Sequence, residues 1–255
     1  MKLSGKELKD FLDEKYLLYN RPTFIESDPI SIPHQFSRKE DIEIAAFFSA
    51  TIAWGQRPTI VKNANRLMDL MDREPYHFIM HSKKKDWEKM DDFVHRTFQY
   101  ADVLYFIRAL QNVYTHHGGL EKVFAEKSKE DMKNGIRHFR KVFLEIAPYE
   151  RTAKHIANVE KNASAKRINM FLRWMVRNDK RGVDFGIWRS ISPALLYCPL
   201  DLHSGRVARK LGLLGRKQDD WKAVNELTIN LRKLDKNDPV KYDFALFGLG
   251  IFEKF

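Results

Sequence analysis

The chain has 255 residues, of which 44% are hydrophobic and 31% are charged, with a formal net charge of +11. This composition is typical of a folded globular protein and excludes a disordered or fibrous one. Its one cysteine, Cys198, excludes a disulfide framework, a multi-cysteine zinc site and a cysteine-ligated iron–sulfur cluster.

Helical patterns separated by short turns follow one another along the chain. In order, the expected helices span residues 42–54, 59–72, 103–117, 131–146, 167–177, 203–211, 221–234 and 240–251. The first is apolar on nearly every side, which predicts a central, buried helix. Strand signals are scarce, because there is no long alternating run and no Asn-Gly hairpin.

Several helix boundaries carry recognisable capping signals. Residues 37–40 match a capping box, Pro58 marks a break before the second helix, and Asp102 is expected to cap the third. The other expected starts and stops are Gly118-Gly119, Asp131, Pro148, Asp201, Gly212, Asp219-Asp220 and Asp238-Pro239. We therefore expect an all-α fold, a compact two-lobed helical bundle forming a single domain over residues 1–255, with the site between its lobes.

No apolar run is long enough to span a membrane, and residues 1–16 are charged and lack the apolar region of a signal peptide. We therefore expect a cytoplasmic protein without a membrane partner.

The positive charge is concentrated in one part of the chain. Residues 151–217 hold 15 Lys and Arg against four acidic residues, which is a local net charge of +11. Aromatic residues are interleaved with these cations, a pattern that favours a nucleic-acid footprint. The alternative is a solubilising face.

Lys166 is the first candidate for chemistry. On a helix that begins near it, Lys166, Arg173 and Arg177 would form one basic stripe, with Ile168 and Phe171 on the opposite, buried face. Neighbouring cations and the helix dipole would favour its neutral, nucleophilic amine. The alternative is a lysine that contacts phosphate or is merely solvated.

Asp201 is the second candidate. It precedes a helical pattern that ends at Gly212, so it is an expected N-cap, and capping alone could explain it. A carboxylate bonded by backbone N–H groups also stays ionised and fixed in direction, which suits catalysis. His203, Arg206 and Lys210 share one face of this helix, which suits phosphate contacts or a solvated surface.

Other motifs are weak. His77 and His81 are four positions apart without the glutamate of a zinc-peptidase motif, and no phosphate-binding glycine loop occurs. His95 begins the stretch HRTF, where a structural histidine is the simpler interpretation. We expect neither a metal nor a cofactor.

The stretch PLDLHSGRVARKLGL (residues 199–213) resembles the catalytic-aspartate segment of the helix-hairpin-helix DNA glycosylase superfamily, which includes endonuclease III and the archaeal 8-oxoguanine glycosylases. Residues 43–67 resemble the superfamily's buried early helix and the turn after it. AKRINMF (residues 165–171) resembles the start of the helix that carries the lysine of its lyase members, and DFALFGLGI resembles its closing helix. HRTF, KRINMFLRWMVR and PLDLH are similar to an uncharacterised bacterial branch.

The resemblance implies a role for each matching residue. It places the catalytic aspartate on Asp201 and the Schiff-base lysine on Lys166. Gln56 and Arg57 would approach the damaged base pair, and the hairpin at residues 160–165 would contact DNA. Further expected DNA contacts are Asn162, Ser164, Arg173, Arg177, His203 and Arg206. The hairpin lacks the family's glycines, and Lys166 and Asp201 are 35 positions apart, more than in endonuclease III.

The expected function is therefore excision of a flipped, damaged base from double-stranded DNA by a glycosylase with possible apurinic/apyrimidinic lyase activity. With this function the protein is expected to be nucleoid-associated and to act as a monomer. Lys166 would attack the sugar, and Asp201 would stabilise the developing positive charge. Two alternatives remain at this point: a non-catalytic nucleic-acid-binding module on the same scaffold, and a helical protein-interaction domain.

Overall fold

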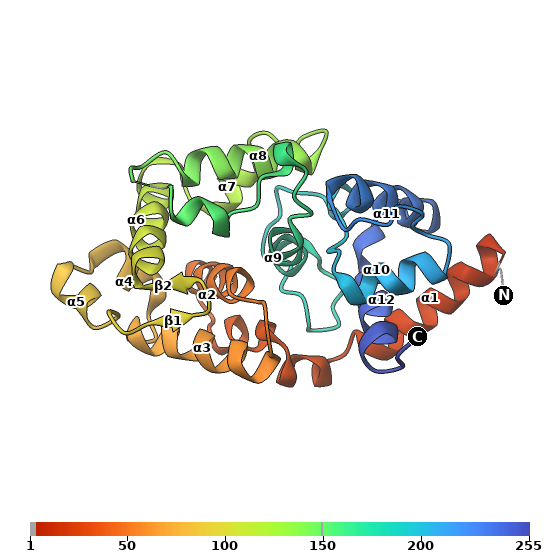
Figure 1. Ribbon diagram of the computed structural model, residues 1–255, viewed down its shortest axis with the longest axis horizontal. Helices are drawn as coiled ribbons and strands as arrows, with labels where there is room; N and C mark the ends of the chain where they lie inside the picture. Colours follow the sequence, from red (N-terminus) through yellow and green to blue (C-terminus); the bar gives the residue numbers. More distant parts are fainter. Residues whose placement is uncertain (1–3, 149) are drawn as a thin grey trace. The chain divides into compact units, whose positions relative to one another are not determined.

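The computed structural model describes residues 4–148 and 150–255, and α-helices dominate them (Figure 1). The chain divides into two compact units. Unit 1 combines residues 1–24 with Asn158–Phe255, and unit 2 is Ile25–Ala157. The all-α fold class predicted from the sequence is confirmed.

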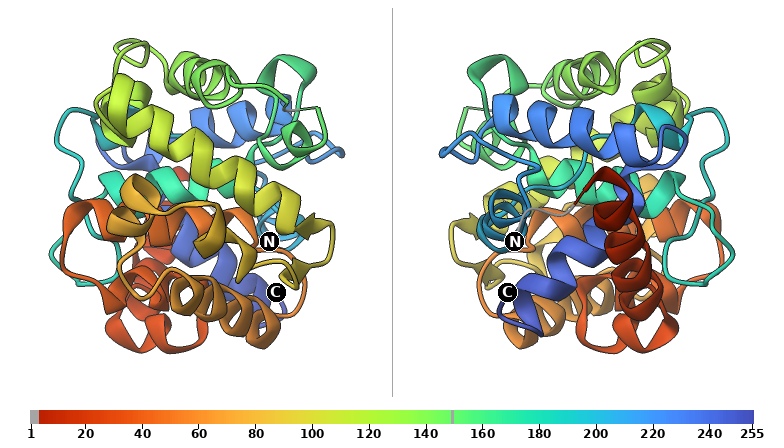
Figure 2. Two further views of the ribbon diagram at one scale, coloured as in Figure 1. Left: turned by 90° about the vertical axis from the view of Figure 1, so that its left-hand side faces the viewer. Right: turned by 90° about the vertical axis from the view of Figure 1, so that its right-hand side faces the viewer.

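Unit 1 contains both ends of the chain. Its α-helices are α1 (Gly5–Tyr19), α9 (Lys166–Val176), α10 (Leu202–Lys210), α11 (Trp221–Leu234) and α12 (Tyr242–Ile251). Short 3-10 helices lie between them at Val159–Lys161, Pro193–Leu195 and Pro239–Lys241. The first and last α-helices, α1 and α12, lie side by side, as the right-hand view of Figure 2 shows.

Unit 2 is built from the central part of the chain. Its α-helices are α2 (Lys39–Thr51), α3 (Arg57–Leu70), α4 (Pro75–His81), α5 (Lys84–Glu88), α6 (Tyr100–His116), α7 (Leu120–Ala125) and α8 (Met132–Phe143). Its 3-10 helices are Pro29–Ser31, Pro33–Gln35 and Thr152–His155, and a further one, Pro22–Ser27, crosses from unit 1. The strands β1 (Val94–His95) and β2 (Phe98–Gln99), of two residues each, pair antiparallel in a hairpin that includes the HRTF stretch.

Helix α2 is buried as its composition predicts, because every residue from Ile42 to Thr51 is inaccessible or nearly so. Phe47 of α2 packs against Phe106 of α6 at 5.5 Å and against Phe143 of α8 at 5.4 Å between ring centroids. Phe106 and Phe143 are themselves 4.9 Å apart. This aromatic cluster is the core that holds the helices of unit 2 together.

Helix α9 forms the corresponding core of unit 1. The four residues predicted to be buried on its apolar face, Ile168, Phe171, Leu172 and Met175, are all buried. The caps at Asp131, Asp201 and Asp220 are confirmed, since each side chain accepts a backbone N–H of the following helix. Gly212 adopts a positive φ directly after α10, as expected for a helix-ending glycine.

Some predicted helix starts are wrong. The Ser37 capping box does not form, because α2 begins at Lys39 and its N-cap is Arg38. The break expected near Pro58 lies just before it, between Thr51 at the end of α2 and Arg57 at the start of α3. Pro58 itself lies in the first turn of α3, where its missing N–H costs nothing.

Two aspartates expected as N-caps have further or other partners. Asp102 lies in the first turn of α6 and caps the helix from there, because its carboxylate accepts the backbone N–H of the N-cap residue Gln99 at 3.0 Å. Asp238 makes no capping bond and directs its carboxylate to Arg177 instead. Among the described residues, no helix is both long and apolar enough to cross a bilayer.

Candidate functional site

Lys166 and Asp201 meet in space. Lys166 is the first residue of α9, Asp201 is the N-cap of α10, and the Lys166 Nζ lies 3.5 Å from the Asp201 Oδ2. Their side chains are 28% and 25% exposed, so both remain accessible to solvent. A pair 35 positions apart in the sequence is thus assembled at the N-terminal ends of two helices within unit 1.

The Asp201 carboxylate is fixed by its capping role. Its Oδ1 accepts the backbone N–H groups of His203 at 2.9 Å and Ser204 at 3.0 Å. Burial alone would raise the pKa of this carboxyl. The charge of Lys166 and the two N–H groups outweigh burial, so the pKa lies below its ordinary value. Asp201 is therefore an ionised carboxylate whose second oxygen faces the lysine.

The turn before α9 places Lys166. Asn162 and Ala165 both adopt a positive φ, the left-handed conformation for which glycine is the usual residue. The Asn162 side chain donates to Asp220 at 2.8 Å and accepts from the backbone of Lys222 at 3.3 Å, so it joins the turn to α11. Ser164 is half-buried, and its carbonyl accepts from Asn169. The structure thus shows structural contacts for Asn162 and Ser164.

The predicted basic stripe on α9 is wrong. Arg173 and Arg177 are 4% and 0% exposed, and neither can reach a DNA backbone from inside the protein. Arg173 pairs with Asp184 at 3.2 Å and with Asp243, and Arg177 pairs with Asp184 at 2.5 Å. The two arginines neutralise buried carboxylates, and only Lys166 of the proposed stripe faces solvent.

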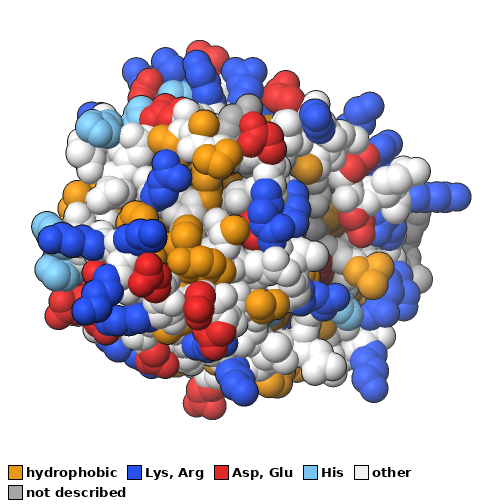
Figure 3. Space-filling view, turned by 60° about the vertical axis from the view of Figure 1, so that its left-hand side comes forward, with side chains coloured by type: hydrophobic (Ala, Val, Ile, Leu, Met, Phe, Trp, Pro, Cys, Tyr) orange, Lys and Arg blue, Asp and Glu red, His pale blue; other side chains and the backbone are white. Residues whose placement is uncertain are grey.

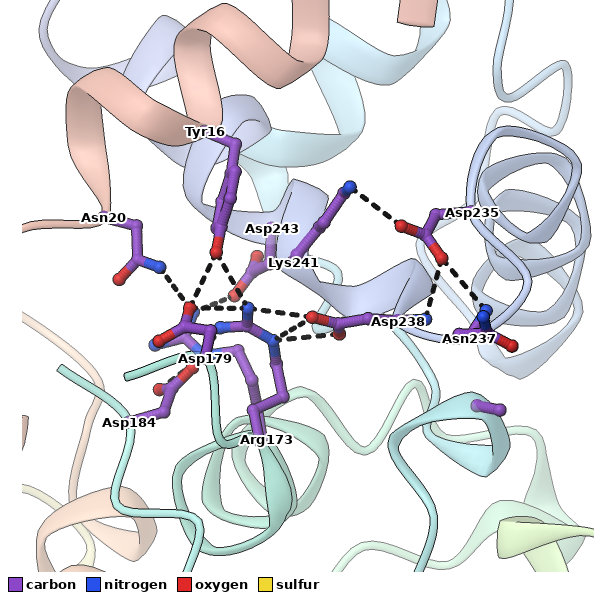
Figure 4. A network of polar contacts seen from close by, with 12 residues as sticks. Tyr16, Asn20, Arg173, Asp179, Asp184, Asp235, Asn237, Asp238, Lys241 and Asp243 are labelled. Carbon is purple, nitrogen blue, oxygen red and sulfur yellow. Dashed lines mark hydrogen bonds and ion pairs between the residues drawn. The ribbon is translucent and has the colours of Figure 1, made fainter. Parts of the chain in front are cut away.

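Figure 4 shows how far this buried network extends. Arg177 also pairs with Asp179 at 2.8 Å and with Asp238 at 2.9 Å. Tyr16 of α1 donates its hydroxyl proton to Asp179 at 2.7 Å. The network therefore joins α1 and α9 to the segment that leads into α12.

The remaining expected contacts of unit 1 lie on α10. Arg206 is exposed and donates to the Gly250 carbonyl at 3.2 Å, His203 is half-buried, and Lys210 is exposed. Their exposure is compatible with both alternatives from the sequence, contact with phosphate and a solvated surface, so the DNA contacts stay a prediction.

Gln56 and Arg57 belong to unit 2, where they begin α3. Gln56 is exposed and Arg57 is half-buried. The preceding Trp54 packs edge-on against His95 at 5.0 Å and stacks on His155 at 6.0 Å. His95 also approaches the Trp54 carbonyl at 3.2 Å and Asn63 at 2.8 Å, so it is a structural histidine that ties the HRTF hairpin to this turn.

A second polar cluster in unit 2 was missed from the sequence. The buried Asp102 carboxylate accepts from Thr152 at 2.9 Å and Arg151 at 3.2 Å, and it lies 3.5 Å from His155. Burial would raise the pKa of Asp102. Its contacts with His155, with the backbone N–H of Gln99 and with Thr152 outweigh burial and lower the pKa to about 2. The sequence signal for this cluster is Asp102, which lies at the start of an apolar helical pattern. It was assigned a capping role alone.

A cavity of about 400 Å³ in unit 2 is lined by Trp87, Arg108 and His116 among others, and it includes none of the predicted site residues. Within residues 4–148 and 150–255, no group of three His, Cys, Asp or Glu side chains could hold a metal ion. On the face drawn in Figure 3, Lys and Arg are mixed with Asp and Glu.

Comparison with known proteins gives a family but no activity. Residues 28–252 match the family described as "Protein of unknown function (DUF2400)". Neither the curated proteins nor the solved structures contain a match to the chain.

Proposed function

The chain belongs to the DUF2400 family, and we propose that it is a DNA glycosylase with apurinic/apyrimidinic lyase activity. The observation that carries this proposal is the 3.5 Å approach of the Lys166 amine to the ionised Asp201 carboxylate. A primary amine and a fixed carboxylate are the two groups that a Schiff-base glycosylase requires.

The environment of the pair supports the same chemistry. Lys166 and Asp201 each remain about one quarter exposed, so a flipped nucleotide can reach both. Exposed Arg206 and Lys210 on α10, and exposed Lys161 at the end of the 3-10 helix before α9, are cations available for DNA phosphates. The substrate of this proposal is double-stranded DNA that contains a damaged base.

In the proposed reaction, Lys166 attacks the sugar C1′ as a neutral amine, and the bond from C1′ to the base breaks. Asp201 stabilises the positive charge that develops on the sugar, because its capping bonds keep it ionised and fixed. The electron pair of the bond from C1′ to the base leaves with the base, which takes up a proton from solvent. The Lys166 nitrogen then loses a proton and the C1′–O4′ bond opens, with O4′ taking up a proton, and the imine that results would allow strand cleavage by β-elimination.

Borohydride trapping on duplex DNA tests the proposal. The substrates are one duplex with an abasic site and a panel with 8-oxoguanine, uracil, thymine glycol or an alkylated base. The wild-type protein should form a covalent adduct with the abasic duplex and with at least one lesion. Lys166→Gln should abolish the adduct, whereas Lys236→Gln, at an exposed lysine on the loop after α11, should leave it unchanged.

Two outcomes would count against the proposal. An adduct that persists in Lys166→Gln would assign the amine to another residue. Salt-dependent binding to duplex DNA with no adduct on any substrate would favour the non-catalytic nucleic-acid-binding module.

A further inference from the structure

The cavity of unit 2 is lined mainly by one face of helix α6. Its volume of about 400 Å³ lies within the range of small-molecule sites. α6 contributes Arg108, Gln111, Asn112, Thr115 and His116, whose spacing places them on a single helical face. α5 contributes Trp87, and the loop after α8 contributes Ile146. The polar face of α6 therefore borders an enclosed space and not only bulk solvent.

The wall from α5 is aromatic and fixed in place. Trp87 is half-buried, and its indole Nε1 donates to the Ser82 hydroxyl at 2.8 Å. The loop with Ile146 is also held, because the Ile146 carbonyl accepts the Tyr105 hydroxyl at 2.9 Å. An indole ring that is held in this way offers a flat surface on which a planar ring can stack.

Two side chains of the cavity can bind an anion. Arg108 is exposed and donates to the Ala147 carbonyl at 3.4 Å, and no carboxylate of the described residues pairs with it. His116 is exposed and can donate an N–H from its ring. Glu145, the carboxylate bound by Asn112, lies 2.6 Å from His117 and is thus already held by two partners. An arginine without a carboxylate partner next to an imidazole favours a phosphate group.

The two amides of the cavity present acceptors. Gln111 donates to the Met80 carbonyl at 3.4 Å, and Asn112 donates to Glu145. These contacts use the amide nitrogens, and in the part of the chain that the structure describes no donor reaches either amide oxygen. Such oxygens can accept the exocyclic amino group of a nucleobase.

We propose that this cavity binds a nucleotide whose base carries an exocyclic amino group. The base stacks on Trp87, its amino group donates to the amide oxygen of Gln111 or Asn112, and its phosphate is bound by Arg108 and His116. The inference goes beyond the proposed function, because the cavity belongs to unit 2 and includes no residue of the proposed reaction. Binding at this site forms and breaks no covalent bond.

Isothermal titration calorimetry with deoxyadenosine monophosphate, in the absence of DNA, tests the site. The wild-type protein should bind it with a Kd below about 1 mM. Three further probes each lack at least one of the expected contacts: thymidine monophosphate has no exocyclic amino group, deoxyadenosine has no phosphate, and inorganic phosphate has no ring. Each should bind about 10-fold more weakly or less tightly still.

Substitutions locate the binding. Arg108→Gln and Trp87→Leu should each weaken the binding of deoxyadenosine monophosphate by about 10-fold or more, whereas Trp87→Phe, which keeps a ring, should stay within about threefold of the wild type. Arg73→Gln is the matched control, because Arg73 is an exposed arginine that is paired with Asp69 and does not line the cavity. Thermal unfolding checks that each variant is folded. If Trp87→Leu does not fold, Arg108→Gln at an exposed position still decides the question.

A free nucleotide and a nucleotide at the 5′ end of a DNA strand offer the same groups to this cavity. A 5′-phosphorylated tetranucleotide that begins with deoxyadenosine separates the two sources. Tighter binding of the tetranucleotide than of deoxyadenosine monophosphate would assign a strand end as the ligand, and weaker binding would assign the free nucleotide.

Several results would overturn the inference. They are the absence of saturable heat up to about 10 mM nucleotide, equal affinity in the wild type and Arg108→Gln, and equal affinity for thymidine monophosphate or inorganic phosphate. The proposed function fails separately. A protein that binds deoxyadenosine monophosphate in this way but forms no borohydride adduct with any duplex would refute the glycosylase and leave the nucleotide site intact.

Discussion

At the scale of single residues, Asp201 combines a structural and a proposed chemical role that substitutions can separate. Asp201→Asn retains a side-chain oxygen for the His203 and Ser204 N–H groups but loses the charge that faces Lys166. Its stability should stay near that of the wild type, and base release should fall by about 100-fold or more. Asp201→Ala should lose the same activity and also about 1 kcal/mol of stability. Urea unfolding and single-turnover assays check both variants, and full activity in Asp201→Asn would reduce Asp201 to a cap.

Asp102 makes a prediction about stability that does not involve the reaction. Its pKa of about 2 in the folded protein lies below the value of about 3.9 expected in the unfolded chain. Its contribution to stability is therefore complete above about pH 4 and is lost as the pH falls through 2. Asp102→Asn should lower the unfolding free energy by about 3 kcal/mol at pH 7, and this difference should shrink between pH 4 and pH 2. Urea titrations at several pH values measure it, with Glu130→Gln at an exposed site as the control.

At the scale of helices, α9 shows what a sequence pattern can and cannot predict. The helical spacing of Ile168 and Phe171 correctly predicts that they are buried. The N-cap at Asp201 is also predicted correctly. Each of these features depends on residues a few positions away in the sequence. The arginine stripe fails partly because two of its carboxylate partners are distant in the sequence. Asp238 lies 61 positions from Arg177, and Asp243 lies 70 positions from Arg173. A polar face of a helix can be buried. The spacing of residues along one helix carries no information about carboxylates that lie far away in the sequence. The approach of Lys166 to Asp201 was expected only from a family resemblance, because spacing alone could not bring them together.

The packing of α12 against α1 depends on a glycine. A Cβ at Gly248 would overlap the ring of Tyr19, so Gly248→Ala should destabilise the protein by about 1–3 kcal/mol despite the better helix propensity of alanine. In a protein that already carries Tyr19→Ala, the ring is gone, so adding Gly248→Ala should cost much less stability than it does in the wild type. Gly5→Ala on α1 is the control, because the methyl group that it adds would meet no other atom within 4 Å. Thermal unfolding of the four variants measures the coupling, and an equal cost of Gly248→Ala in both backgrounds would contradict this account.

At the scale of the whole chain, the excess positive charge belongs mainly to the unit that contains Lys166 and Asp201. Unit 1 has 24 Lys and Arg against 15 Asp and Glu, a net charge of +9, and unit 2 has 21 against 19. The buried network takes up two arginines, Arg173 and Arg177, and four aspartates, 179, 184, 238 and 243. Without these six residues, unit 1 still holds 22 basic residues against 11 acidic ones. The loss of Arg173 and Arg177 from the expected DNA footprint therefore does not weaken the electrostatic case for a polyanion.

This charge distribution predicts how DNA binding depends on salt. The logarithm of the association constant should fall linearly with the logarithm of salt concentration, because each phosphate contact releases counterions. Arg206→Gln and Lys210→Gln on α10 should each reduce the steepness of that line by about 1, and they should do so on lesion-free duplex too. Arg73→Gln, at an exposed arginine of unit 2 that is paired with Asp69, should leave the slope unchanged. Fluorescence anisotropy at four or more salt concentrations measures each slope. Equal slopes for Arg206→Gln, Lys210→Gln and Arg73→Gln would place the DNA-binding surface elsewhere, even if Lys166 forms its adduct.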